Sequence, residues 1–221
     1  MVRINDNGKW VFKEPTKDLV YIIVPGAGTY TNRDIYEKLK SDYSVVYIGS
    51  SGGVYDSYPL NWEMNGMVGM NGNNLGGLAC VIRDRMSRLN EIPALILCGS
   101  RGGQVTIGKV WESIWRGPTI IINAGCLTTH THIPMGVKPM FIIMEFDYFT
   151  TVNNIVKVSR LFDHLKEKKS HKMSIVYLKS QSHMPKYRGE LEGLLGNTIK
   201  YMLGGSERIG IKSNRMIIYN N

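Results

Sequence analysis

The stretch LILCGSRGG, from Leu95 to Gly103, decides how the rest of the chain is interpreted. Its first half is a short apolar run that predicts a buried strand, and the glycines after it predict a tight turn. Ser100 stands in that turn, between Gly99 and Gly102. Three roles for Ser100 are open from this local pattern alone. It could cap a helix, belong to a phosphate-binding loop, or act as an exposed nucleophile.

Apolar runs of the same kind recur along the chain and alternate with helix-like segments. The predicted strands are residues 19–26, 43–49, 93–99, 118–125, 138–146 and 172–180, and the predicted helices are residues 33–42, 73–90, 104–115, 151–168 and 188–204. Continuously apolar strands that alternate with helices predict an α/β fold, a three-layer α/β/α sandwich with a mostly parallel sheet. Residues 10–15 predict an additional antiparallel strand at one edge of that sheet.

Length and composition set the class of protein. The chain has 221 residues, 43% of them hydrophobic, which predicts one domain over residues 1–221. It has no apolar run of the ~20 residues needed to span a membrane, and its first residues lack the pattern of a signal peptide. We therefore expect a cytoplasmic protein. Cys80, Cys98 and Cys126 each lie in or beside an apolar run, which predicts buried, reduced thiols.

The net charge of +9 is unevenly distributed. Residues 157–188 contain nine Lys and Arg against two acidic residues, Asp163 and Glu167, a net charge of +7 for this stretch. Such a stretch is commonly a solvated helix and its following loop. It would also attract an anionic substrate, an anionic membrane surface or a nucleic acid. The chain has no recognisable nucleic-acid-binding motif, so nucleic acid is the weakest of these alternatives.

The segment from Gly49 to Asn74 is rich in Gly, Asn, Ser, Tyr and Met and has no strand or helix pattern. A loop of this length in a compact domain is usually functional or disordered. Because it follows the carboxyl end of a predicted strand, it is a candidate pocket wall or lid beside the site. A surface loop without a role is the alternative.

Two polar side chains follow later strands of the predicted sheet. Asp147 comes just after the strand 138–146, and His183 comes just after the last predicted strand. Glu145 competes with Asp147, although it lies closer to the strand. A serine hydroxyl needs a base, and the base needs an acid that orients it. The carboxyl ends of parallel strands meet at one edge, so Ser100, Asp147 and His183 are expected to lie together.

These residues carry a resemblance to a known family. The chain is similar to the α/β-hydrolase superfamily, from Leu19 to about Leu203 in strand and helix order. Residues 98–102, CGSRG, stand where that family has its nucleophile elbow, with Cys98 in place of the usual first glycine. The order Ser100, Asp147, His183 is also the family's order of nucleophile, acid and base.

The resemblance implies an activity and a set of roles. It implies a serine hydrolase that cleaves a carboxylic ester or thioester through an acyl-enzyme. The implied oxyanion donors are the backbone N–H groups of Ala27 and Arg101, and Gly28 is the next candidate after Ala27. No cofactor and no metal are predicted, and the substrate is a small acyl ester or thioester for which the basic stretch favours an anionic group. The alternative function is a non-catalytic protein of the same fold that binds a ligand or partner.

The remaining histidines are interpreted as ordinary polar residues. His130 and His132 lie in the segment TTHTHIP and could be metal ligands with Cys126 nearby, but no further ligand joins them locally. His164 and His171 are expected to be solvated. Only about 15 residues, from Ala124 to Lys138, separate the strands between which many α/β hydrolases insert a cap domain. The resemblance is therefore to a minimal, capless hydrolase.

Overall fold

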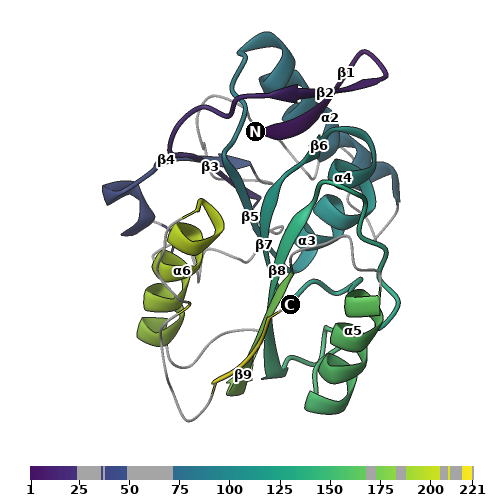
Figure 1. Ribbon diagram of the computed structural model, residues 1–221, viewed down its shortest axis with the longest axis vertical. Helices are drawn as coiled ribbons and strands as arrows, with labels where there is room; N and C mark the ends of the chain where they lie inside the picture. The colour runs from purple at the N-terminus through teal and green to yellow at the C-terminus, as the bar shows by residue number, and fades with distance from the viewer. Residues whose placement is uncertain are drawn as a thin grey trace.

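The computed structural model describes residues 1–23, 36, 38–48, 72–167, 173–182, 188–204, 209 and 216–220. Its centre is a seven-stranded sheet with the order β10-β9-β8-β7-β5-β3-β4 (Figure 1). The strands of this sheet are β3 (Leu19–Ile23), β4 (Ser44–Ile48), β5 (Leu95–Gly99), β7 (Pro118–Ile122), β8 (Lys138–Phe146), β9 (Ser174–Ser182) and β10 (Met216–Asn220). The six predicted strands are all confirmed, with ends shifted by a few residues.

Six of these strands run parallel to one another, and β10 pairs antiparallel with β9 at one edge. The register of the central strands is continuous: Ile23 pairs with Cys98, and Gly99 pairs with Ile122. The carboxyl ends of β3, β5, β7 and β8 therefore lie at the same edge of the sheet, which is where sites form in open α/β sheets. β10 was not predicted from the sequence.

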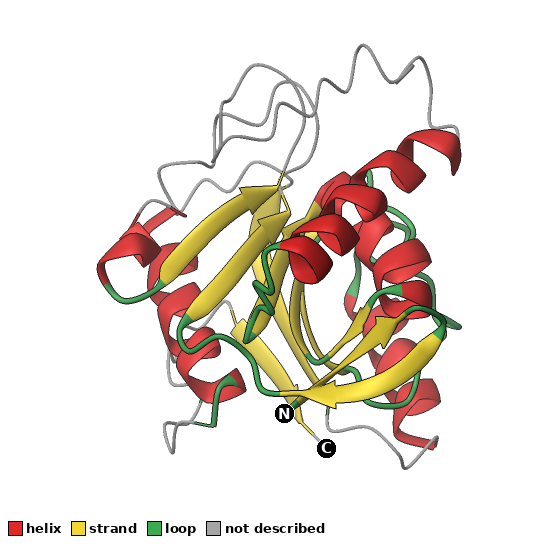
Figure 2. Ribbon diagram, turned by 90° about the horizontal axis from the view of Figure 1, so that it is seen from above, coloured by secondary structure: helices red, strands yellow, loops and turns green. Residues whose placement is uncertain are grey.

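Helices cover both faces of the sheet (Figures 1 and 2). The helical segments are η2 (Lys38–Ser41, a 3₁₀ helix), α2 (Gly72–Arg88), α3 (Ser100–Val105), η3 (Thr106–Val110, a π-helix), α4 (Trp111–Ser113), α5 (Ile155–Glu167) and α6 (Arg188–Met202). Figure 1 shows α6 on one side of the sheet, with α3, α4 and α5 on the other. The predicted helices 73–90, 151–168 and 188–204 correspond to α2, α5 and α6. The three-layer α/β/α prediction is confirmed.

Successive side chains of each strand pack alternately into two separate hydrophobic cores, one on each face of the sheet. On β3, Tyr21 and Ile23 pack into the core that includes α2, α3 and α5, whereas Val20 and Ile22 pack into the core that includes η2 and α6. This is the period of two expected when both faces of a strand are buried. It explains why the strands have no polar face in the sequence.

The N-terminal residues differ from the expectation. The strand predicted at residues 10–15 exists as β2 (Lys9–Lys13), but it does not join the main sheet. It pairs with β1 (Val2–Asp6), and β1 pairs with β6 (Trp115–Arg116), so that a separate three-stranded antiparallel sheet forms. Asn7 and Gly8, both at positive φ, make the turn between β1 and β2. Trp115 is the last residue of the helix predicted at 104–115, and Arg116 follows it, so the sequence did not indicate this partner strand.

Two other predictions need correction. The helix predicted from residue 104 begins instead at Ser100, so the glycine pair lies inside the helix. Of the three cysteines, Cys98 is buried, whereas Cys80 and Cys126 are exposed, and all three are free. Residues 49–71 of the predicted loop lie outside the described residues, and Gly72 to Asn74 are the first residues of α2. The predicted helix at 33–42 is described only at Tyr36 and at η2.

Candidate active site

The site is built on the turn that joins β5 to α3. β5 ends at Gly99 and α3 begins at the next residue, Ser100, so that no loop separates the strand from the helix. The N-cap position is Gly99, in an extended conformation, and no side chain caps the helix. The interpretation of Ser100 as the N-cap is therefore wrong. Ser100 is half-buried and adopts a φ of +49°.

A positive φ at Ser100 is informative because L-residues other than Gly, Asn and Asp rarely adopt it. The left-handed conformation costs about 1–2 kcal/mol for a residue with a side chain. Such backbone strain persists only where the surrounding structure enforces it, and it is concentrated at functional sites. The turn therefore holds a serine in a conformation that glycine would adopt without strain.

Two glycines allow the turn to fit against its neighbours. A Cβ atom on Gly102 would lie 2.3 Å from the backbone oxygen of Ile23, at the end of β3. A Cβ atom on Gly103 would lie 2.6 Å from Cβ of Ala124, just after β7. The first turn of α3 is thus in direct contact with the residues that end the two strands flanking β5. Only glycine permits this approach.

We expect Gly102→Ala to lower the free energy of unfolding by about 3 kcal/mol, because backbone of β3 or α3 must move to admit the methyl group. Gly108→Ala is the matched control in the same helical run, since a Cβ there meets nothing within 4 Å. Alanine at residue 108 should leave stability unchanged or raise it by up to about 1 kcal/mol. Urea denaturation of both variants measures the difference. Equal stability of the two variants would contradict the close approach at Gly102.

The backbone N–H of Arg101 lies in the first turn of α3, where N–H groups have no partner within the helix and carry a positive partial charge. Ala27 and Gly28, the candidates for the second oxyanion donor, lie outside the described residues. Cys98 precedes the turn with its side chain buried, and burial raises the pKa of its thiol to about 12. A thiol with that pKa stays protonated at neutral pH, so Cys98 is no nucleophile.

Asp147 follows β8 at the same edge of the sheet. Its side chain is 0% exposed. The turn after β8 forms around it: Oδ1 accepts a hydrogen bond from the N–H of Phe149 (2.9 Å), and its carbonyl oxygen accepts one from the amide of Asn153 (3.1 Å). A buried carboxylate is rare unless it is paired. Asp147 is therefore held in place by its own turn.

The competing carboxylate, Glu145, makes a structural hydrogen bond to the neighbouring strand. One of its oxygens accepts a hydrogen bond from the backbone N–H of Ser180 on β9, at 2.8 Å. Ser180 has a φ of +60°, and the pairing of β8 with β9 shifts register between Met144 and Phe146. Glu145 thus bridges an irregular part of the β8–β9 ladder. This contact accounts for Glu145 structurally and leaves Asp147 as the better candidate acid.

His183, the predicted base, lies outside the described residues. β9 ends at Ser182, so the chain reaches His183 directly from the strand next to β8. The structure therefore brings the turns at Ser100 and Asp147 to one edge of the sheet. It describes nothing of the histidine itself.

Asn123 is a residue of this edge that the sequence analysis missed. It is buried, with a φ of +50°, and lies just after β7, between the strands of Ser100 and Asp147. Its side-chain oxygen accepts a hydrogen bond from the N–H of Met144 at 2.9 Å, three residues before Asp147. Asn123 therefore fixes the end of β8. The signal in the sequence is an asparagine that ends an otherwise apolar strand.

The other histidines are placed as follows. His130 and His132 are exposed in the segment between β7 and β8. His164 was expected to be solvated, but it is half-buried on α5 and its ring packs edge to face against His130, with centroids 5.1 Å apart. The part of the chain that the structure describes contains no group of three His, Cys, Asp or Glu residues that could hold a metal. His171 lies outside the described residues.

The segment between β7 and β8 is fully described and contains turns but no helix. It agrees with the expectation that no helical cap domain is inserted there. Of the basic stretch 157–188, the described parts lie on α5, β9 and the start of α6.

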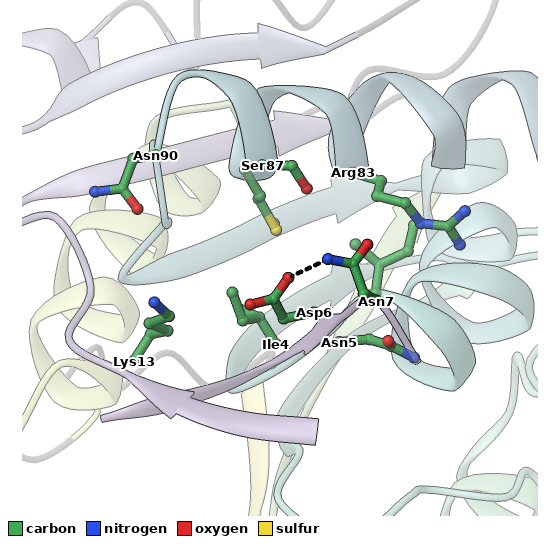
Figure 3. A pocket seen from close by; sticks show the side chains of 10 residues that line it. Ile4, Asn5, Asp6, Asn7, Lys13, Arg83, Ser87 and Asn90 are labelled. Atoms are coloured by element: carbon green, nitrogen blue, oxygen red, sulfur yellow. Dashed lines mark hydrogen bonds between the residues drawn. The ribbon is translucent and has the colours of Figure 1, made fainter. Parts of the chain in front are cut away.

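A separate cavity of about 240 Å³ lies between the β1–β2 hairpin and α2 (Figure 3). Its lining is mostly polar and includes Asp6, Lys13, Arg83 and Asn90. Asp6 accepts a hydrogen bond from Asn7 inside it, as Figure 3 shows. Asn90 precedes β5 in the chain, so the cavity lies toward the amino ends of the strands. It is not part of the edge that carries Ser100.

Comparison with solved structures identifies the fold. A serine hydrolase homologue from Coxiella burnetii is 14% identical, with a TM-score of 0.55 over 85% of this chain and 88% of that one. Esterase 2 from Thermogutta terrifontis, phosphorylated by paraoxon, is 10% identical, with a TM-score of 0.58 over 94% and 90%. A serine hydrolase without lid from Xanthomonas campestris is 14% identical, with a TM-score of 0.54 over 87% and 88%.

No protein-family model matches the sequence, and no curated protein matches it. The structural similarity, at identities this low, establishes the fold. The chain has the α/β-hydrolase fold.

Proposed function

We propose that the protein is a serine hydrolase that cleaves a carboxylic ester or thioester. The observation that carries the proposal is the strained turn at Ser100, which has a φ of +49° and joins β5 directly to α3. In α/β hydrolases such a turn exposes the nucleophile at the carboxyl edge of the sheet. Serine hydrolases and an esterase are among the solved proteins that share this fold.

The proposed reaction follows the acyl-enzyme route. His183 takes the proton of the Ser100 hydroxyl as Ser100 attacks the acyl carbon, and the carbonyl oxygen becomes an oxyanion. The N–H groups of Arg101 and Ala27 stabilise that oxyanion. The leaving alcohol or thiol takes the proton from His183. A water molecule then attacks the acyl-enzyme in the same way and frees Ser100.

Asp147 has the role of the acid in this proposal. Its carboxylate would hold the imidazole of His183 in one orientation and stabilise the imidazolium that forms. The turn after β8 supports this assignment, because the N–H of Phe149 holds the carboxylate and the amide of Asn153 holds the backbone carbonyl of Asp147 before substrate binds. No cofactor or metal has a step in the reaction.

A fluorophosphonate probe tests the proposal, because it reacts covalently with a serine that an active site activates and leaves ordinary serines unlabelled. Esterase 2 from Thermogutta terrifontis, one of the structurally similar proteins, is phosphorylated by paraoxon, which is also a phosphorus electrophile. We expect one label per chain, on Ser100 by peptide mapping, which is absent in Ser100→Ala. Labelling should fall strongly in His183→Ala. Absence of labelling in correctly folded wild-type protein would favour the non-catalytic binding function instead.

A further inference from the structure

Exposed apolar side chains are concentrated beside the candidate acid. Five of the ten large apolar residues that are exposed in the described part of the chain lie within eleven residues of sequence. We call this group the 146–156 patch; its members are Phe146, Tyr148, Phe149, Ile155 and Val156. Tyr148 is 84% exposed and Phe149 is 77% exposed. Exposed aromatic residues at this density usually mark a surface that binds something.

The segment that carries the patch folds back on itself. The side chain of Asn153 donates a hydrogen bond to the carbonyl of Asp147, which ties the start of α5 to the turn that carries Tyr148 and Phe149. The ammonium group of Lys157 donates to the carbonyl of Thr151 at 2.9 Å and ties the first turn of α5 to the same segment. The turn that carries Tyr148 and Phe149 is therefore tied to the start of α5, where Ile155 and Val156 lie.

Basic residues adjoin the patch. Val156 and the exposed Arg160 are four residues apart on α5 and so share a face of the helix. Lys157 lies at the border of the patch, and Lys179 is exposed on β9, the strand next to β8. Asp163 is an exposed carboxylate further along α5, while Glu145 is bonded to the N–H of Ser180. By sequence, the stretch that begins at Lys157 has a net charge of +7.

We propose that the 146–156 patch binds the surface of an anionic lipid bilayer. Aromatic side chains, above all Tyr and Trp, favour the interface of a bilayer, where one end of the side chain is apolar and the other is solvated. Lys and Arg near that surface are attracted to anionic headgroups. None of the described helices is long and apolar enough to cross a bilayer. The inference does not depend on catalysis, because binding needs no reaction at Ser100.

Co-sedimentation with vesicles tests this inference, with Ser100→Ala protein so that no substrate is consumed. Vesicles of phosphatidylcholine with 30% phosphatidylglycerol should bind the protein, and pure phosphatidylcholine should bind it about tenfold more weakly. The double variant Tyr148→Ser, Phe149→Ser should lose at least about tenfold in affinity for the anionic vesicles. Phe12→Ser is the matched control, since Phe12 is 63% exposed on β2, outside the patch, and its loss should not change binding.

Two single variants test the inference even if the double variant Tyr148→Ser, Phe149→Ser does not fold. Phe149→Trp should bind anionic vesicles more tightly, because Trp favours the interface. Arg160→Glu should bind them about fivefold more weakly or worse. The inference is overturned if the Ser100→Ala protein with an unchanged patch does not bind anionic vesicles. It is equally overturned if the double variant Tyr148→Ser, Phe149→Ser binds them as well as the control Phe12→Ser does. It is also overturned if the patch instead drives concentration-dependent dimerisation in gel filtration without vesicle binding.

Discussion

Ser100→Ala is expected to abolish ester hydrolysis, with a fall in kcat of about 10⁶-fold against a chromogenic short-chain ester. The reason is that the oxygen of Ser100 forms the bond to the acyl group in the proposed reaction. Cys98 is two residues away, but its thiol is buried with a pKa raised to about 12. Residual turnover should match what transition-state binding alone provides, roughly 10³–10⁴-fold over water. Steady-state kinetics with the purified variant measures this.

The control for this prediction is a second variant, Ser100→Gly, which should relieve the backbone strain at the same residue. Ser100→Gly should be as inactive as Ser100→Ala, but more stable by about 1 kcal/mol, because only glycine adopts a φ of +49° without cost. Thermal or urea denaturation compares the two variants. If both were equally stable, the turn would not be strained in solution. If Ser100→Ala kept the wild-type kcat, Ser100 would not be the nucleophile.

The sequence was enough to predict the main sheet because burial on both faces leaves a clear pattern. β3, β5, β7, β8 and β9 are continuous apolar runs, and each was predicted within a few residues. β10 was missed because MIIYN follows a segment without periodicity and pairs only at an edge. β2 has the pattern of an edge strand, but the pattern does not reveal which strand it pairs with. Its partners β1 and β6 are short, and β6 has two residues at the end of a helical run.

In the candidate site, too, some features could be predicted from the sequence and others could not. The glycines around Ser100 indicated a tight turn, but only the backbone contact between Gly102 and Ile23 explains why alanine cannot replace glycine there. The sequence favoured Asp147 over Glu145 by position alone, because Glu145 lies within the predicted strand and Asp147 just after it, but it gave no partner for Glu145. That partner depends on the register shift between β8 and β9, which brings Glu145 to the N–H of Ser180. A register shift leaves no mark in the residue types.

Asp147→Asn is expected to lower kcat about 10⁴-fold, the second large effect. The asparagine oxygen can still accept a hydrogen bond from the N–H of Phe149, so the turn and the fold should remain. The variant loses only the negative charge that would stabilise the imidazolium of His183. Glu145→Gln is the matched control two residues away. The glutamine oxygen can still accept the N–H of Ser180, so kcat should stay at the wild-type level.

The pair of variants separates the two carboxylates because both changes remove one charge from the same segment. A general loss of negative potential at this edge of the sheet would lower kcat in Asp147→Asn and Glu145→Gln alike. A specific contact with the base lowers it only in the variant of the acid, with the effect mostly in kcat and little in KM, because the imidazolium forms only as the reaction proceeds. If Glu145→Gln were the inactive variant, the acid would be Glu145, and the buried carboxylate of Asp147 would serve only to hold its turn. Kinetics at constant pH, with circular dichroism to check folding, distinguishes these outcomes.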